Sequence, residues 1–126
     1  MTDDLVHDLR AYYLMERDIP QLYDGINPNI RTKYKETCED LRIRAKAATG
    51  AFQMQLLMDI EESTRYAWED LVLLRTKKII KIALYEAETG YKSDISGALS
   101  WEKEKYPALV ESIRALIQTG FHDDTD

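Results

Sequence analysis

Acidic side chains at helical spacing are the first residues in this sequence that could do chemistry. Glu36 and Glu39 stand three residues apart, so both would project from one face of a helix. A magnesium-dependent all-α nucleotide pyrophosphohydrolase needs two such acidic pairs on facing helices. The later acidic clusters do not supply the second pair, because Arg65 stands three residues after Glu62. Solvated helix faces explain these carboxylates more simply, and the hydrolase is kept only as a lesser alternative.

Histidine, cysteine and glycine give no stronger sign of an enzyme. His7 and His122 have no partner at the spacing of a metal site or a general base. Cys38 has no histidine nearby, and a cysteine on an apolar helix face is usually inert packing. None of the five glycines lies in a phosphate-binding pattern. We therefore expect no catalytic residue, no metal ligand and no cofactor.

Positive charges gather in one segment of an otherwise acidic region. Between Leu71 and Tyr85 every charged residue is basic, and these residues are Arg75, Lys77, Lys78 and Lys81. A solvated helix face accounts for such a basic stripe. The functional alternative is a docking patch for an acidic partner or a DNA backbone. The net charge of −6 argues against a dedicated nucleic-acid binder, so direct DNA contact stays an open alternative for these four candidate docking residues.

Aromatic residues are the second candidate set. Eight tyrosines and two tryptophans in 126 residues exceed what a small helical core easily holds, because tyrosine needs a polar outlet. Tyr12 and Tyr13 project about 100° apart on a helix, so they cannot both point to one core. Tyr66 and Trp68 lie midway along the longest apolar segment. Aromatic residues anchor many interfaces, so these four are candidate subunit contacts and favour an oligomer.

Two predicted helices precede the longest segment. The first spans about 2–17, with Thr2 or Asp3 as its cap, and it places Leu5, Leu9, Tyr12, Tyr13 and Glu16 on one face. Pro20 prevents its continuation. The second starts with Asn27 as N-cap and Pro28 at the first helical position, and it runs to about Ala48. Its inner face carries Ile30, Tyr34, Cys38 (or Thr37), Leu41 and Ala45.

The third predicted helix is unusually long. No proline or glycine occurs from Ala51 to about Glu88, which corresponds to roughly 57 Å of helix. A break at 62–64 is the alternative, and Gly90 is a suitable C-terminal stop. Its predicted inner face is Phe52, Leu56, Ile60, Ala67, Leu71, Leu74, Ile79, Ile82 and Ala83. A helix this long in a short chain must extend past its own domain or be shared with a partner.

The last predicted helix starts at Ser100, or nearer Tyr106 because of Pro107, and ends at Gly120. Its predicted buried face is Tyr106, Leu109, Val110, Ile113, Leu116 and Ile117. The sequence therefore predicts an all-α bundle of four to five helices, including one long helix, over residues 1–119. Residues 120–126 form an acidic linker or tail.

Composition places the chain among ordinary proteins of the cytoplasm. Apolar residues make up 44% and charged residues 32%, which excludes wholesale disorder. No apolar run approaches the roughly 20 residues that span a bilayer, and the N-terminus is acidic where a signal peptide would be basic. A single cysteine cannot form an internal disulfide. We expect a cytoplasmic protein with no membrane association.

Three segments together resemble the helical domain of GINS subunits. The segment 75–90, RTKKIIKIALYEAETG, resembles the basic and then aliphatic end of the family's long helix. The segment 16–22 followed by Asn27-Pro28-Asn29-Ile30 is similar to the linker between its first two helices. Leu99-Ser100-Trp101-Glu102-Lys103 is similar to the step that opens its last helix, with Trp101 where proline is usual. The resemblance covers most of residues 5–118 and is greatest to the archaeal type with the helical domain first.

The resemblance implies a non-enzymatic role in DNA replication. GINS is a four-subunit accessory of the replicative helicase, and its helical domains assemble into a homo- or heterotetramer. Its partners are the MCM helicase, a RecJ-like nuclease, primase and polymerase, so the resemblance also implies a nucleoid location at replication forks. In this type a small β-rich domain follows the linker, where this chain has its acidic tail. An unrelated helical oligomerisation or regulatory module is the alternative.

Overall fold

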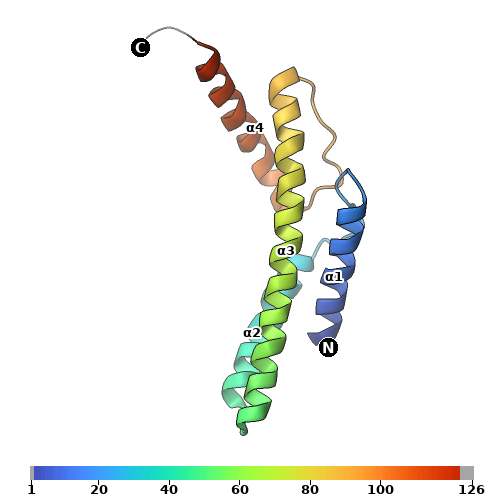
Figure 1. The fold of residues 1–126 in the computed structure, drawn as a ribbon, viewed down its shortest axis with the longest axis vertical. Helices are drawn as coiled ribbons and strands as arrows, with labels where there is room; N and C mark the ends of the chain where they lie inside the picture. The colour runs from blue at the N-terminus through green and yellow to red at the C-terminus, as the bar shows by residue number, and fades with distance from the viewer. Residues whose placement is uncertain (1, 123–126) are drawn as a thin grey trace.

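The computed structural model describes the backbone of residues 2–122 and the side chains of residues 5–122. Within this part the chain forms four helices and no strand. They are α1 (Thr2–Asp18), α2 (Ile30–Ala47), α3 (Ala51–Thr89) and α4 (Ser100–Phe121). The prediction of an all-α bundle with one long helix is therefore confirmed (Figure 1).

The long helix α3 is the axis of the molecule. Each of the other three helices packs mainly against α3. The helix α2 pairs antiparallel with the N-terminal half of α3 through a short turn, α1 lies along its middle, and α4 runs beside its C-terminal half (Figure 1). The C-terminal end of α4 leans away from α3 (Figure 1). One helix therefore gives every other element its position.

The helix α3 is continuous through 62–64, so the alternative of a break there is wrong. Thr64 is buried at this point, and its hydroxyl donates to the carbonyl oxygen of Ile60 at 2.7 Å, which keeps the polar group satisfied inside the helix. The predicted stop is confirmed, because Gly90 follows α3 with a φ of 77° and donates its N–H to the carbonyl of Glu86.

The start of α2 differs from the prediction by two residues. Pro28 and Asn29 form a turn, and the helix begins at Ile30. The side chain of Asn27 accepts the backbone N–H of Asn29 at 2.9 Å, so it stabilises this turn and does not cap the helix directly. Asparagine is competent for either role, and the local sequence does not separate them.

The helix α4 starts at Ser100 as predicted, with Pro107 inside it. The N–H of Leu99 donates to the Glu102 carboxylate at 2.7 Å and closes the first turn. The helix continues to Phe121, so Gly120 lies in its last turn and does not end it. The predicted caps Thr2 and Asp3, and the tail residues 123–126, lie outside the side chains that the structure describes.

The predicted inner faces of α1 and α2 agree with the packing, apart from partial exposure of the tyrosines. Their buried residues include Leu5, Leu9 and Glu16 on α1. On α2 they are Ile30, Cys38, Leu41 and Ala45. The main core joins both helices to Ala67 and Leu71 of α3.

The register predicted for the first turns of α3 is wrong. Phe52 is 84% exposed and Leu56 is 50% exposed, whereas Leu57 is buried against α2. On α4, Tyr106 and Val110 are buried, but Leu116 is 74% exposed, which is consistent with the divergence of α4 from α3. Both errors come from apolar residues on helix faces that no other element covers.

Across the residues that the structure describes, none of the helices combines the length and the apolar character needed to cross a membrane.

Candidate interaction site

A buried ion cluster lies where α1, α3 and α4 meet. At its centre is Arg75 of α3, which is only 1% exposed. Its guanidinium forms a bidentate salt bridge with the Glu102 carboxylate of α4, with Nε to Oε2 at 2.9 Å and Nη2 to Oε1 at 2.7 Å. Its Nη1 donates to Glu16 of α1 at 2.6 Å and to the carbonyl of Tyr23 at 2.9 Å. One side chain thus connects three helices and the loop after α1.

Lys78, one turn further along α3, completes the cluster. Its Nζ is 2.7 Å from the second oxygen of the Glu16 carboxylate. It also donates to the carbonyl oxygens of Glu16, Ile19 and Gln21, where α1 ends. The last carbonyls of a helix lack partners within the helix and carry its negative dipole, so this ammonium group caps α1.

The charges of the cluster balance, with two cations facing two carboxylates. Burial alone would lower the pKa of Arg75, but its bonds to Glu102 and the charges of Glu102 and Glu16 more than offset this, and the net effect is a raised pKa. Within the described part of the chain, every buried side-chain nitrogen and oxygen atom has a hydrogen-bond partner. The cluster is therefore saturated, and its geometry joins the helices instead of presenting groups to a ligand.

This arrangement corrects half of the predicted docking patch. Arg75 and Lys78 point into the molecule, and their charges are paired with those of Glu16 and Glu102. Neither can serve as an exposed docking residue. Lys77 and Lys81 are exposed on α3 and remain candidates.

Two of the four predicted contact aromatics also have internal partners. Trp68 stacks on Tyr34 of α2, with ring centroids 4.8 Å apart and planes at 15°, and it lies 6.0 Å from Trp101 of α4. Tyr12 packs beside Tyr23, and its hydroxyl accepts the N–H of Asn27 at 3.4 Å. These rings connect elements of the same chain.

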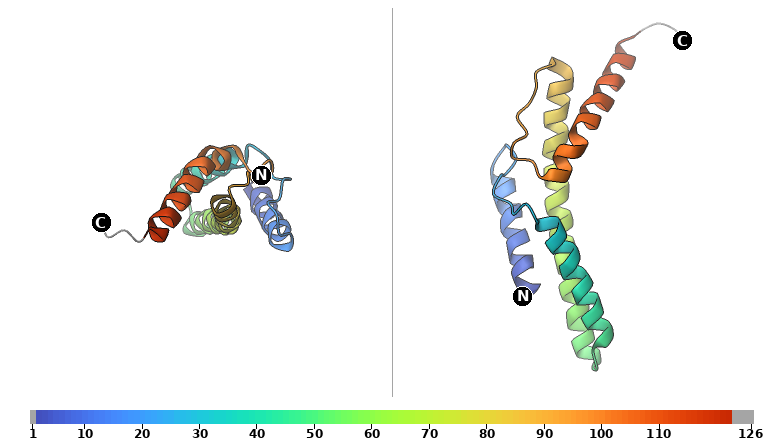
Figure 2. Two further views of the ribbon diagram at one scale, coloured as in Figure 1. Left: turned by 90° about the horizontal axis from the view of Figure 1, so that it is seen from above. Right: turned by 180° about the vertical axis from the view of Figure 1, so that it is seen from behind.

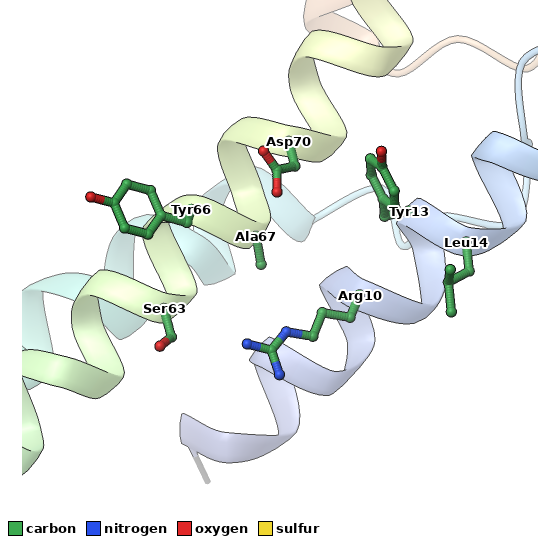
Figure 3. Close-up of a pocket in the computed structure, with 7 residues that line it drawn as sticks. All are labelled: Arg10, Tyr13, Leu14, Ser63, Tyr66, Ala67 and Asp70. Atoms are coloured by element: carbon green, nitrogen blue, oxygen red, sulfur yellow. The ribbon is translucent and has the colours of Figure 1, made fainter.

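The other two predicted contact residues, Tyr13 and Tyr66, line one groove between α1 and α3 (Figure 3). The groove has a volume of about 370 Å³. Arg10 of α1 extends across it toward the side of Ser63 (Figure 3). Tyr66 is 54% exposed, and its ring is directed away from α1 (Figure 3). The structure thus brings Tyr13 and Tyr66 to one surface and separates them from Tyr12 and Trp68.

Next to the groove, one side of α3 is covered by none of the other described helices, α1, α2 and α4 (Figure 2). Eight exposed residues follow this side at intervals of one to four positions, and we call them the α3 stripe: Glu62, Tyr66, Asp70, Leu73, Lys77, Ile80, Lys81 and Leu84. Apolar side chains within it are far from buried, since Leu73 is 58% and Ile80 is 45% exposed. Charged side chains lie between these apolar ones, and exposed apolar groups bordered by polar residues are typical of an interaction surface.

The residues tested for enzyme chemistry are not brought together. Glu36 and Glu39 are exposed on α2, and the described residues contain no group of three or more side chains that could hold a metal ion. Cys38 is buried, and this burial raises the pKa of its thiol, which makes it a poor nucleophile. His7 is exposed on α1 and His122 lies just after α4.

Sequence reasoning missed the ion cluster, although one signal pointed to it. Glu16 falls on the predicted inner face of the first helix, and a carboxylate buried on an apolar face requires a cationic partner. That requirement predicts a buried arginine or lysine elsewhere. It does not say which one, and the partner is 59 residues away.

Comparison of the chain with protein-family models, with curated proteins and with solved structures gives no significant match.

Proposed function

We propose that this chain is a non-enzymatic assembly subunit of the GINS type, which scaffolds the replicative helicase and bridges it to other replication proteins. The observation that carries the assembly role is the α3 stripe. It spans 62–84, about 33 Å of helix, and presents four large apolar side chains that are 41–58% exposed. A helix exposed in this way gains stability when a partner covers it.

The sequence resemblance supports the specific choice of GINS. The segment 75–90 contains Arg75 and Lys78 of the buried ion cluster and the Gly90 stop of α3, and the segment 99–103 contains Glu102 of the same cluster. The segments that carry the resemblance are therefore those that position α1 and α4 on α3. An unrelated helical oligomerisation module is the second candidate, and the same exposed stripe favours it equally.

The partners follow from the proposed family. We propose association with other GINS subunits in a homo- or heterotetramer, and with the MCM helicase, a RecJ-like nuclease, primase and polymerase at replication forks in the nucleoid. Lys77 and Lys81 are the candidates for docking an acidic partner or a DNA backbone, because their charges are exposed.

Light scattering on the purified chain at micromolar concentration tests the assembly role. We expect a mass that is a multiple of the 14.7 kDa monomer. A monomer under these conditions would contradict assembly of the chain with itself.

Binding to the purified MCM helicase separates the GINS type from an unrelated module. We expect saturable binding of the helicase to the assembled chain. If the assembled chain does not bind the helicase, the assembly role stands and the GINS assignment is wrong.

A further inference from the structure

We propose that two copies of this chain pair antiparallel through the α3 stripe, with a two-fold axis near Leu73. The inference rests on the proposed assembly function. It goes beyond that function by naming the partner surface, the orientation and the residues that meet.

The spacing of the stripe suits the pairing of two helices. Tyr66, Leu73 and Ile80 recur at seven-residue intervals, and Leu84 follows four residues after Ile80. Asp70 and Lys77 occupy the positions between them that complete the steps of four and three of a two-helix seam, so apolar layers alternate with charged ones. A partner helix laid along this side would cover all four of these apolar side chains.

The charges of the stripe are divided along its length. Glu62 and Asp70 lie in the N-terminal half, and Lys77 and Lys81 lie in the C-terminal half. The ion pairs within the described residues involve none of these four side chains. Their charges therefore remain available to a partner, unlike those of the buried cluster.

This division selects a second copy of the chain as the partner. In an antiparallel pair centred near Leu73, Asp70 of one copy faces Lys77 of the other, and Glu62 lies within about a turn of Lys81. Two-fold symmetry repeats each contact, and Leu73 meets its own equivalent on the axis. A parallel pair would place Asp70 against Asp70 and Lys77 against Lys77, and such like-charge contacts are unfavourable.

The groove between α1 and α3 lies along the edge of this seam. Leu14 lines the groove and is 47% exposed. The proposed two-fold axis is perpendicular to α3 and lies in the interface, so it keeps both α1 helices on the same flank of the pair. Leu14 of α1 then extends the interface beyond α3.

Disulfide trapping tests the orientation directly. We expect Leu73→Cys to give a cross-linked dimer under mild oxidation, because the two sulfur atoms meet near the axis. Ile80→Cys should not cross-link to itself, since antiparallel pairing separates its two copies by about 21 Å along the helix. A mixture of Ile80→Cys and Tyr66→Cys should cross-link. Self-linking of Ile80→Cys, or no linking of Leu73→Cys, would overturn the proposal.

Two controls make the trapping specific. The wild-type chain keeps only the buried Cys38, so it should not cross-link. Glu36→Cys adds a thiol on the exposed surface of α2, away from the stripe, and should give no more than background linking. All the substituted positions are at least 45% exposed or lie on open helix surface, and circular dichroism checks that each variant folds.

Charge reversal tests the pairing by an independent route. Asp70→Lys alone and Lys77→Asp alone each create two like-charge contacts, and we expect each to weaken self-association by about tenfold or more in sedimentation velocity. Mixing the two variants creates two complementary contacts and should restore a dimer. Unchanged association of both single variants, or no recovery in the mixture, would refute the proposal.

The outcomes distinguish this proposal from the proposed function. If the chain is monomeric, the antiparallel pairing and the homo-oligomeric form of the proposed assembly are both wrong. If it assembles while neither the charge reversals nor the Leu73→Cys trap has an effect, the assembly function stands and the antiparallel pairing is wrong.

Discussion

Replacement of Arg75 by alanine is the most informative perturbation of the monomer. The change removes the guanidinium that contacts Glu16 and Glu102 and leaves both carboxylates inside the molecule. The Glu16 side chain is 0% exposed and the Glu102 side chain is 9% exposed, so both carboxylates are shielded from bulk solvent. Lys78 still reaches Glu16, but Glu102 keeps no cationic partner.

The magnitude follows from the cost of an uncompensated buried charge. Removal of one partner from a buried ion pair costs about 3–5 kcal/mol. A domain of this length is stable by roughly 6–19 kcal/mol, so Arg75→Ala should remove a large fraction of the total. We expect Tm to fall by roughly 10–20 °C. Arg75→Lys keeps the charge but loses the bidentate salt bridge, so it should lower the stability less than Arg75→Ala does.

Urea unfolding monitored by circular dichroism and tryptophan fluorescence measures the effect, because the rings of Trp68 of α3 and Trp101 of α4 lie 6.0 Å apart and Trp101 directly precedes Glu102. Lys77→Ala is the matched control on the exposed side of the same helix, and it should change the free energy of unfolding by no more than about 0.5 kcal/mol. A double-mutant cycle with Glu102→Gln should give a coupling energy above about 1 kcal/mol. If Arg75→Ala changes the free energy of unfolding by less than about 1 kcal/mol, the buried ion cluster does not hold α1 and α4 on α3.

Five further substitutions probe separate parts of the structure. Lys78→Met removes the cap of α1 and one partner of Glu16, and should cost about 2–4 kcal/mol in urea unfolding. Tyr106→Phe loses the bond to Glu86 at 2.8 Å and should cost about 1 kcal/mol. Hydrogen bonds from the backbone N–H of Ser93 and from Tyr106 lower the pKa of Glu86 below its ordinary 4.5. Ionised Glu86 therefore contributes to the stability of the folded state above that pH, and this contribution is lost as the pH falls through the lower folded-state pKa. Unfolding titrations should therefore show a steeper acid loss in the wild type than in Glu86→Gln, and equal slopes would contradict this. Gly90→Ala should destabilise the protein by about 1 kcal/mol, because the φ of Gly90 is 77°. Gly120 lies inside α4 with open space around it, so Gly120→Ala should stabilise the protein slightly. Effects of the same sign would refute this distinction.

Helices with one apolar face were predictable, and helices with several were not. On α2 the apolar residues recur only on one side, so Ile30, Cys38 and Leu41 were assigned correctly. The first turns of α3 carry apolar residues around the whole circumference, so periodicity does not select a face there. The packing of α2 on Leu57 decides the register, and that contact is tertiary.

The candidate site shows the same limit for polar residues. Local sequence reveals that Glu16 lies on an inner face, but its partner is chosen by how α1 docks on α3. The aromatic residues behave similarly, since Trp68 and Tyr66 are two positions apart on α3 and point to opposite sides. Trp68 packs against Tyr34 and Trp101 of the same chain, whereas Tyr66 is 54% exposed beside the groove.

The basic run of α3 combines two roles that helix geometry separates. Arg75 and Lys78 are three residues apart and share the inner side, while Lys77 and Lys81 are four apart and share the outer side. Residues 75 and 77 differ by about 200° around the axis, so adjacent positive charges reach opposite surroundings. The inner pair is tied to Glu16 and holds the monomer together, and the outer pair remains free for a partner. Substitutions at Lys77 and Lys81 should therefore change association without changing the stability of the monomer, and those at Arg75 and Lys78 should change the stability of the monomer first.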